Sequence, residues 1–146
     1  MPIKVAVEQR DEFRLVVYRY SGHIDMADVL AAVTNAVNQF APNQSYCELL
    51  IFKHDADLSD FDPKSLATFY KKCDELFEKL KSGPRTAAAV LDNSIDAKLI
   101  MPFFNALSQA GRGVDLSFEL FIDVEPALQR LGIPVEEGLK VVARAA

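Results

Sequence analysis

The chain has 146 residues, half of them apolar and a quarter charged, with a formal net charge of −5. This length fits one domain that removes roughly 70% of its unfolded surface from water, and the composition is typical of a soluble globular protein. Lys and Arg are spread along the chain without a basic cluster, which argues against nucleic acid and against anionic membranes as partners.

The N-terminal segment MPIKVAVEQR lacks the long apolar stretch of a signal peptide, and no apolar run reaches the length of a membrane span. We therefore expect a cytoplasmic protein with no integral membrane segment. The two cysteines, Cys47 and Cys73, fall in a predicted strand and a predicted helix. Each is expected to be a small buried apolar residue, because a disulfide is unusual in a reducing compartment.

The first part of the chain predicts a β-hairpin followed by a helix. Two β-like runs, Ile3–Val7 and Phe13–Tyr20, are separated by the polar loop EQRDE. The helix that follows has Asp25 as its expected N-cap and apolar residues at helical spacing. These apolar residues are Val29, Leu30, Val33, Ala36, Val37 and Phe40.

The middle of the chain predicts a buried strand and the most clearly marked helix. The nearly continuous apolar run Cys47–Lys53 is typical of a strand that is covered on both faces. The helix is expected to begin with Asp62 as its cap and Pro63 in its first position, and to end at Gly83. Its apolar stripe consists of Leu66, Phe69, Tyr70, Cys73, Leu76, Phe77 and Leu80.

A strand of small side chains, Thr86–Leu91, leads into a third helix. Ser94 is the expected N-cap of this helix, and Gly111 marks its end. Pro102 lies inside it and is expected to kink the helix or delay its start, because proline removes an internal hydrogen bond.

The last part of the chain predicts a strand over Leu116–Ile122 and then a short helix between Asp123 and Gly132. Residues 133–146 are compatible with a frayed helix or a strand. The whole order, ββαβαβαβα, predicts a single-domain α/β fold with about four helices. Its sheet is expected to be mixed and mainly parallel, with one antiparallel strand from the N-terminal hairpin.

This order, the polar LDNS after the third-helix strand and the ending FELFIDVEPALQRLG together resemble the STAS-like family. These are bacterial domains similar to anti-sigma-factor antagonists of the sporulation stage II AA type. Glu125, Ala127 and Leu128 fit the family's ending, whereas Arg130-Leu131 stands where Trp-Leu is common. We expect a single domain over residues 1–146, with residues 133–146 as a C-terminal tail. The resemblance covers about residues 13–132 of this domain. It implies a regulatory, protein-binding role.

In the antagonists proper, the second helix opens with Asp-Ser-Ser-Gly, and a serine there is phosphorylated by a partner kinase. The equivalent positions of this chain are Asp62, Pro63, Lys64 and Ser65. Only the aspartate matches, so the resemblance does not carry the phosphorylation switch to this chain. Ser65 is interpreted as a plain residue of the first turn, with phosphorylation as the alternative, because a phosphate near a helix N-terminus is electrostatically favourable.

The loop HDADLSDFD gathers His54, Asp55, Asp57, Asp60 and Asp62, the ligand types of a hard cation. The calcium-loop pattern fails after its start, because aspartate stands where the sharp turn needs glycine and Leu66 stands where a bidentate glutamate belongs. We therefore predict no metal site and no cofactor.

Catalytic residues are not predicted either. The sequence has no G-x-S-x-G elbow after a strand, and its two histidines, His23 and His54, have no obvious nucleophile beside them.

The run LIMPFF in the third helix is apolar on more than one helical face, whereas a helix that covers a sheet needs a single stripe. The surplus predicts a second contact, which is a dimer interface, a protein partner or a pocket for an apolar ligand. The alternative is a helix that is buried on several sides. The candidate residues are Leu99, Ile100, Met101, Phe103, Phe104 and Leu107.

The sequence thus favours a non-catalytic regulatory or protein-interaction module, expected to be a homodimer that recognises its partner through the second and third helices. The alternative is a carrier that holds a lipid or another apolar small molecule between the sheet and the third helix. An enzyme is the weakest interpretation, because no acid, base and nucleophile converge in the pattern.

Overall fold

The computed structural model describes residues 2–111 and 115–146, and in these ranges the chain forms one five-stranded sheet with five helices. The strands are β1 (Ile3–Gln9), β2 (Arg14–Tyr20), β3 (Tyr46–Phe52), β4 (Arg85–Val90) and β5 (Glu119–Phe121). The helices are α1 (Met26–Val37), α2 (Pro63–Lys79), α3 (Ile95–Ala110), α4 (Val124–Arg130) and α5 (Val135–Arg144). The predicted α/β class is therefore confirmed, with one helix more than the sequence indicated.

The strands lie in their sequence order, β1-β2-β3-β4-β5. The N-terminal hairpin makes β1 antiparallel to β2, and every later neighbour is parallel, as predicted. Val17, Leu49 and Ala88 lie side by side across the three inner strands and are fully buried. These strands read as continuous apolar runs because helices cover both faces of a parallel sheet.

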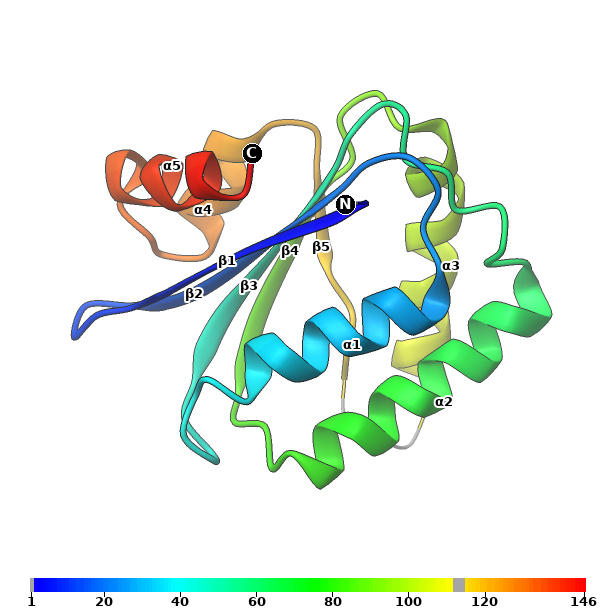
Figure 1. Cartoon of the computed structure of the whole chain (residues 1–146), viewed down its shortest axis with the longest axis horizontal. Helices are drawn as coiled ribbons and strands as arrows, with labels where there is room; N and C mark the ends of the chain where they lie inside the picture. The colour runs from blue at the N-terminus through cyan, green and yellow to red at the C-terminus, as the bar shows by residue number, and fades with distance from the viewer. Residues whose placement is uncertain (1, 112–114) are drawn as a thin grey trace.

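Helices α1, α2 and α3 cover one face of the sheet, and α4 and α5 cover the other (Figure 1). The larger core lies under the first three helices and contains Tyr18, Leu50 and Ala89. The smaller core lies under α4 and α5, where Leu128 and Val141 pack on the opposite side of the same strands. Side chains alternate between the two faces along each strand, so one strand supplies both cores.

Three of the predicted N-caps form as expected. Asp25, Asp62 and Ser94 accept hydrogen bonds from the backbone N–H groups of Ala27, Ser65 and Ala97 at 2.8, 2.8 and 3.1 Å. Each bond satisfies a donor that the first helical turn leaves without an internal partner. Asp123 stands at the N-cap of α4 without such a side-chain bond.

Two boundaries differ from the prediction by more than two residues. Helix α2 ends at Lys79 rather than at Gly83, and the last strand begins at Glu119 rather than at Leu116. The backbone of Phe118 is engaged by the Asn105 side chain, whose Oδ1 accepts from its N–H at 2.8 Å and whose Nδ2 donates to its carbonyl at 2.7 Å. A peptide group that is paired in this way is not available to the neighbouring strand.

The C-terminal tail is helix α5, and it belongs to the smaller core. Gly138 lies so close to α4 that a Cβ atom at this position would stand 2.7 Å from both terminal methyl groups of Leu128. Pro102 is tolerated inside α3, which begins at Ile95 directly after its cap, so the start of the helix is not delayed.

Candidate functional site

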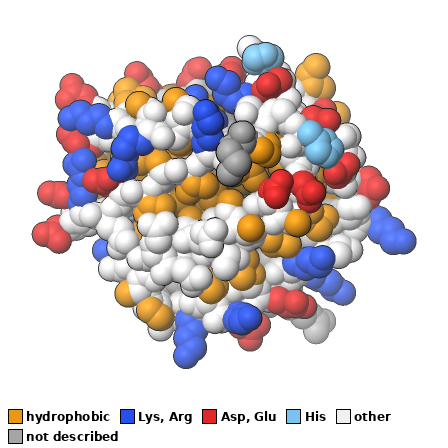
Figure 2. Space-filling view, viewed as in Figure 1, with side chains coloured by type: hydrophobic (Ala, Val, Ile, Leu, Met, Phe, Trp, Pro, Cys, Tyr) orange, Lys and Arg blue, Asp and Glu red, His pale blue; other side chains and the backbone are white. Residues whose placement is uncertain are grey.

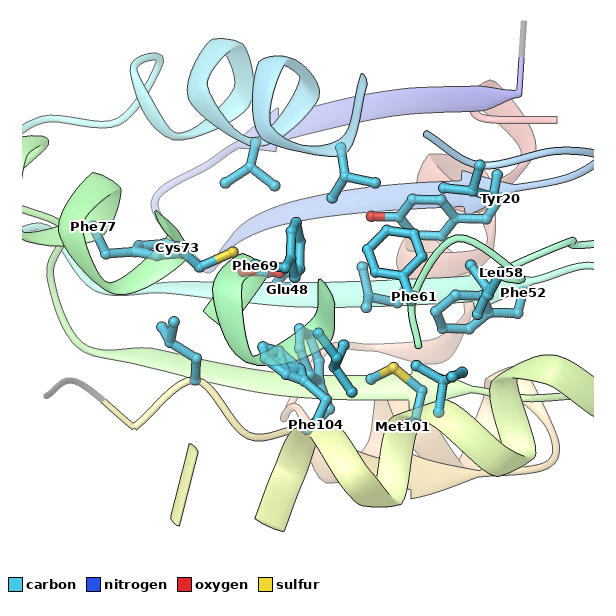
Figure 3. Close-up of a pocket in the computed structure, with 18 of the residues that line it drawn as sticks. Tyr20, Glu48, Phe52, Leu58, Phe61, Phe69, Cys73, Phe77, Met101 and Phe104 are labelled. Atoms are coloured by element: carbon cyan, nitrogen blue, oxygen red, sulfur yellow. The ribbon is translucent and has the colours of Figure 1, made fainter. Parts of the chain in front are cut away.

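A cavity of about 80 Å³ lies inside the larger core, between the sheet and helices α1, α2 and α3 (Figure 3). Its walls come from every layer of this half of the fold. Strands β2 to β4 contribute Tyr20, Glu48, Leu50, Phe52 and Arg85, and the helices contribute Val29, Val33, Leu66, Phe69, Cys73, Phe77, Ile100, Met101 and Phe104. Ile24, Leu58, Phe61, Leu116 and Phe118 of the connecting segments complete the walls.

The local sequence explains why these side chains meet. In β3, Glu48, Leu50 and Phe52 recur at every second position and therefore point to the same face of the sheet. In α2, Leu66, Phe69, Cys73 and Phe77 repeat at intervals of three and four residues and form its buried stripe. On β4, the neighbouring positions of this face hold Ala87 and Ala89, whose small side chains fill little of the space above the strand.

The loop between β3 and α2 closes the cavity at the carboxyl edge of the sheet. Leu58 and Phe61 point from this loop into the cavity and are each 5% exposed (Figure 3). The ring of Phe61 meets the ring of Phe69 edge-on, with centroids 5.2 Å apart. The backbone N–H of Leu58 donates to the Asp96 carboxylate at 2.8 Å, which joins this loop to the first turn of α3.

A buried ion pair forms the polar part of the cavity wall. Arg85 Nε lies 3.0 Å from Glu48 Oε2, and the two side chains are 5% and 4% exposed. The Arg85 guanidinium also donates to the carbonyl oxygens of Asp115 and Leu116 at 3.3 and 3.1 Å, and it lies 4.6 Å above the centre of the Phe118 ring. The charge of Arg85 is therefore balanced and its donors are engaged inside the core.

The other polar groups of the wall are held in their neutral forms. Burial, followed by the charge of the nearby Glu48 carboxylate, raises the pKa of the Cys73 thiol to about 12. The Tyr20 hydroxyl points into the cavity (Figure 3), and burial followed by the charge of Glu48 raises its pKa. A neutral thiol and a neutral phenol are poor nucleophiles at neutral pH.

The six apolar residues singled out in the third helix fall on different faces of α3. Met101 and Phe104 are buried and line the cavity together with the half-buried Ile100. Leu107 is half-buried and packs against the same core. Leu99 and Phe103 point to the other side and are 71% and 46% exposed. The apolar surplus of the sequence therefore corresponds to one cavity-lining face and one exposed face.

The positions equivalent to the antagonists' switch lie at the start of α2, next to Phe61. Asp62 caps the helix through the N–H of Ser65, and this bond is the main cause that lowers the pKa of Asp62. Pro63 and Lys64 are exposed, and Ser65 is half-buried in the first turn.

His23 is the polar residue at this edge that sequence reasoning did not connect with the acidic loop. Its Nδ1 lies 3.2 Å from Asp57 Oδ2 and its Nε2 lies 3.0 Å from Asp60 Oδ2. The backbones of the two loops also pair, because Asp57 donates to the Gly22 carbonyl at 2.7 Å and Ile24 donates to the Asp57 carbonyl at 3.0 Å. Because β2 and β3 are parallel neighbours, the loops that follow them lie at the same edge of the sheet. The predicted strand order could therefore have placed His23 beside the acidic loop.

The hydrogen bond with Asp57, followed by the charge of Asp60, raises the pKa of His23. The pKa of Asp57 falls to about 2, chiefly through its hydrogen bonds with Ser59. Of the acidic-loop residues, Asp57 and Asp60 thus face a histidine. Within the described ranges, no three His, Cys, Asp or Glu side chains are arranged to hold a metal ion.

No family model matches the chain, and no curated protein matches it significantly. Among the helices that the structure describes, none has the length and apolar character needed to cross a bilayer.

Proposed function

We propose that the protein is a non-catalytic binding module that holds an apolar small molecule in the cavity between the sheet and α3. The observation that carries this proposal is the cavity itself, which is lined mainly by aliphatic and aromatic side chains and has one internally balanced ion pair in its wall. Interiors normally pack with few voids larger than a water molecule, and an apolar void tends to stay dry. A cavity with such walls favours a ligand with apolar surface.

The size of the cavity limits what it accepts at rest. An engineered apolar cavity of about 150 Å³ accommodates benzene, so about 80 Å³ admits only a few heavy atoms. A ligand with a longer chain requires α3 or the Leu58–Phe61 loop to move outward. Pro102 favours α3 as the mobile part, because it has no N–H to donate to the carbonyl four residues earlier.

A second candidate function is the regulatory, protein-binding role that the resemblance to anti-sigma-factor antagonists implies. The exposed face of α3 favours it, because Ile95, Leu99 and Phe103 repeat every four residues and are 74%, 71% and 46% exposed. Such a row of large apolar side chains is the usual anchor of a helix that binds in a groove of another protein. The two functions are compatible, since they use opposite faces of one helix.

A native mass spectrum of the purified protein, paired with a denatured one, tests the first proposal directly. The expected result is an adduct that is present in the native spectrum and absent after denaturation. Titration with straight-chain alcohols of increasing length, followed by methyl NMR signals of the cavity residues, then measures which chain lengths enter. Repeated empty spectra together with unperturbed methyl signals contradict the proposal.

A matched pair of variants separates cavity binding from surface binding. Leu50→Phe adds volume to the cavity wall, and Leu99→Phe makes the same change on the exposed face of α3. We expect Leu50→Phe to abolish the methyl shifts caused by the alcohols and Leu99→Phe to leave them unchanged. The reverse outcome assigns the alcohols to the exposed face.

A further inference from the structure

Strand β1 forms one edge of the sheet, and its seven residues pair with β2 on one side only. The direction of its backbone groups follows from the ladder. Ser21 donates to the Pro2 carbonyl and Arg10 donates to the Phe13 carbonyl, both at 2.9 Å. In an antiparallel ladder, hydrogen-bonded pairs alternate with non-bonded pairs, so the even-numbered residues of β1 point their backbone groups toward β2.

The backbone groups of Ile3, Val5, Val7 and Gln9 therefore point away from the sheet. One of these outward-pointing groups already has a partner within the chain: the Val7 carbonyl accepts a hydrogen bond from the Arg144 side chain of α5 at 3.2 Å. An open strand edge of this kind is a ready template for another strand, and proteins usually protect it with charges, proline or a covering element. Val5, at the middle of the edge, is instead an apolar residue that is 38% exposed.

The sequence of β1, IKVAVEQ, is complementary to itself in one antiparallel register. With Ala6 opposite the Ala6 of a second copy, Lys4 stands opposite Glu8 and Val5 stands opposite Val7. The two pairs that result, Val5 with Val7 of the other copy and Val7 with Val5 of the other copy, both have backbone groups that point outward. They are therefore hydrogen-bonded pairs of the ladder between the copies. Glu8 already accepts hydrogen bonds from Arg10 and Arg144 of its own chain at 2.7 and 2.8 Å, so Lys4 of the second copy would join an existing charge cluster. Directly opposite residues of opposite charge stabilise such a ladder, whereas moving the register by two residues toward the N-terminus places Lys4 opposite Ala6 and loses this pairing.

A groove of about 490 Å³ runs along the same edge, between β1 and α1. Figure 2, which has the same view as Figure 1, shows apolar side chains gathered between β1 and α1, where this groove lies. The apolar part of its lining comes from Ile3, Val5 and Val7 of β1 and from Ala31, Ala32 and Ala36 of α1, and Asp28, Asn35 and Gln39 contribute polar groups. These small residues on α1 leave room beside the strand for the valines of an added strand, which lie on the same face as those of β1.

We propose that a second copy of this chain binds here, pairing β1 with β1 antiparallel around Ala6 to form one sheet that continues across a two-fold axis. Such an interface is isologous, so each surface meets its own copy. Arg144 is compatible with this pairing, because the Val7 carbonyl has a second lone pair for the N–H of Val5 in the other copy. The proposal is independent of any ligand in the cavity.

The oligomeric state of the full chain tests the proposal, measured by light scattering after size exclusion over a wide range of concentrations. We expect a dimer for the native chain and its loss in Val5→Pro. The Val5 N–H points outward, so proline there removes a donor of the interface and none of the β1–β2 ladder. Val5→Ile keeps the donor and is the matched control, for which the dimer persists.

Disulfide trapping tests the register. In a chain with Cys47→Ser and Cys73→Ala, the Ala6→Cys variant places two cysteines on a directly opposite, non-bonded pair, with Cα atoms about 4.5 Å apart. We expect this variant to give a covalent dimer on mild oxidation, whereas Val5→Cys, which faces Val7, does not. A native chain that is monomeric at all concentrations, a dimer that survives Val5→Pro in a folded protein, or trapping through residue 5 instead of residue 6 overturns the proposal.

Discussion

The carboxylate of Glu48 and the guanidinium of Arg85 meet 3.0 Å apart inside the larger core, on the neighbouring strands β3 and β4. The pair does more than balance two charges, because Arg85 also donates to the carbonyl oxygens of Asp115 and Leu116. It thereby attaches the segment before β5 to the centre of the sheet and forms the polar part of the cavity wall. A buried pair of this kind is costly to break from one side, since the remaining charge stays desolvated.

We predict that Glu48→Leu and Arg85→Met each lower the free energy of unfolding by about 3–5 kcal/mol, the usual cost of leaving one buried charge unpaired. The double variant is expected to lose much less than the sum of the two, because it leaves no buried charge. Urea denaturation of the four proteins gives the coupling free energy.

Additive losses in that cycle contradict the prediction and show that each side chain acts through its own packing. Leu49→Ala, on the other face of β3, is a useful control because it disturbs the same strand without touching the pair. Its cost is expected to be the same in the native and Arg85→Met backgrounds.

The contact of His23 with Asp57 and Asp60 predicts a pH-dependent interaction between the β2–α1 loop and the β3–α2 loop. The folded-state pKa of His23 is raised, so its contribution to stability is complete below the unfolded value of about 6.5 and is lost as the pH rises through the folded pKa. The pKa of Asp57 is lowered to about 2, so its contribution is lost only in strong acid. The interaction between His23 and the two aspartates is therefore strongest in mildly acidic solution.

An NMR titration of the His23 ring is expected to give a pKa above 6.5 that falls toward this value in Asp57→Asn and in Asp60→Asn. The difference in urea midpoint between mildly acidic and alkaline solution should shrink in His23→Gln. All three side chains are about half exposed, so high salt is expected to weaken the effect. A His23 pKa that neither aspartate variant changes contradicts the assignment.

Much of the fold was readable from the sequence, because each element carried its own signal. The stripe of α2, with Asp62 and Pro63 at its start, and the apolar run of β3 gave the correct element types. The start of β5, which the sequence placed wrongly, depends on a distant contact. Nothing near Leu116 shows that Asn105, in another element, engages the backbone of Phe118 and shortens β5.

The candidate site was predicted only in part. The apolar surplus of α3 was visible, but its division into a cavity face and an exposed face depends on how the helix lies on the sheet. The lone Glu48 within an apolar strand was the available signal for a buried polar contact, and its partner Arg85 lies 37 residues later. Pairing of that kind follows from strand order, which a local pattern does not contain.

The two faces of α3 predict opposite outcomes for two neighbouring phenylalanines. Phe104→Ala is expected to lower the free energy of unfolding by about 3–5 kcal/mol, because the buried ring contacts Phe69, Tyr70 and Phe118. Phe103→Ser, on the exposed face, is expected to change stability by about 0.5 kcal/mol or less. Thermal and urea unfolding of both variants measure the difference.

The variants of Phe103 and Phe104 also test the protein-binding hypothesis. If a partner recognises the exposed face, Phe103→Ser loses the partner while the fold is retained, and Leu99→Ser behaves in the same way. A folded Phe103→Ser protein that keeps its partner contradicts recognition through this face. A Phe103→Ser protein that unfolds shows instead that the residue belongs to the core.

The contact between Gly138 and Leu128 predicts that an added methyl group on α5 is harmful. Alanine is a better helix former than glycine by about 1 kcal/mol, so Gly138→Ala should stabilise a free helix. Here its Cβ would stand 2.7 Å from both terminal methyl groups of Leu128, which is fully buried. Overpacking typically costs about 1–3 kcal/mol, so we expect the variant to be less stable than the native chain.

Shortening the opposing side chain provides the control. In a Leu128→Val background the contact with the two Leu128 methyl groups is relieved, and the approach to Ile133 Cγ2 at 3.2 Å remains. Gly138→Ala is then expected to be less harmful than in the native chain, because the larger of the two clashes is gone and the helix-forming preference of alanine is retained. Urea midpoints of the four proteins separate the two terms. If Gly138→Ala stabilises the native chain by about the full helix preference of 1 kcal/mol, Leu128 yields without cost and the close approach of α5 to α4 does not require glycine.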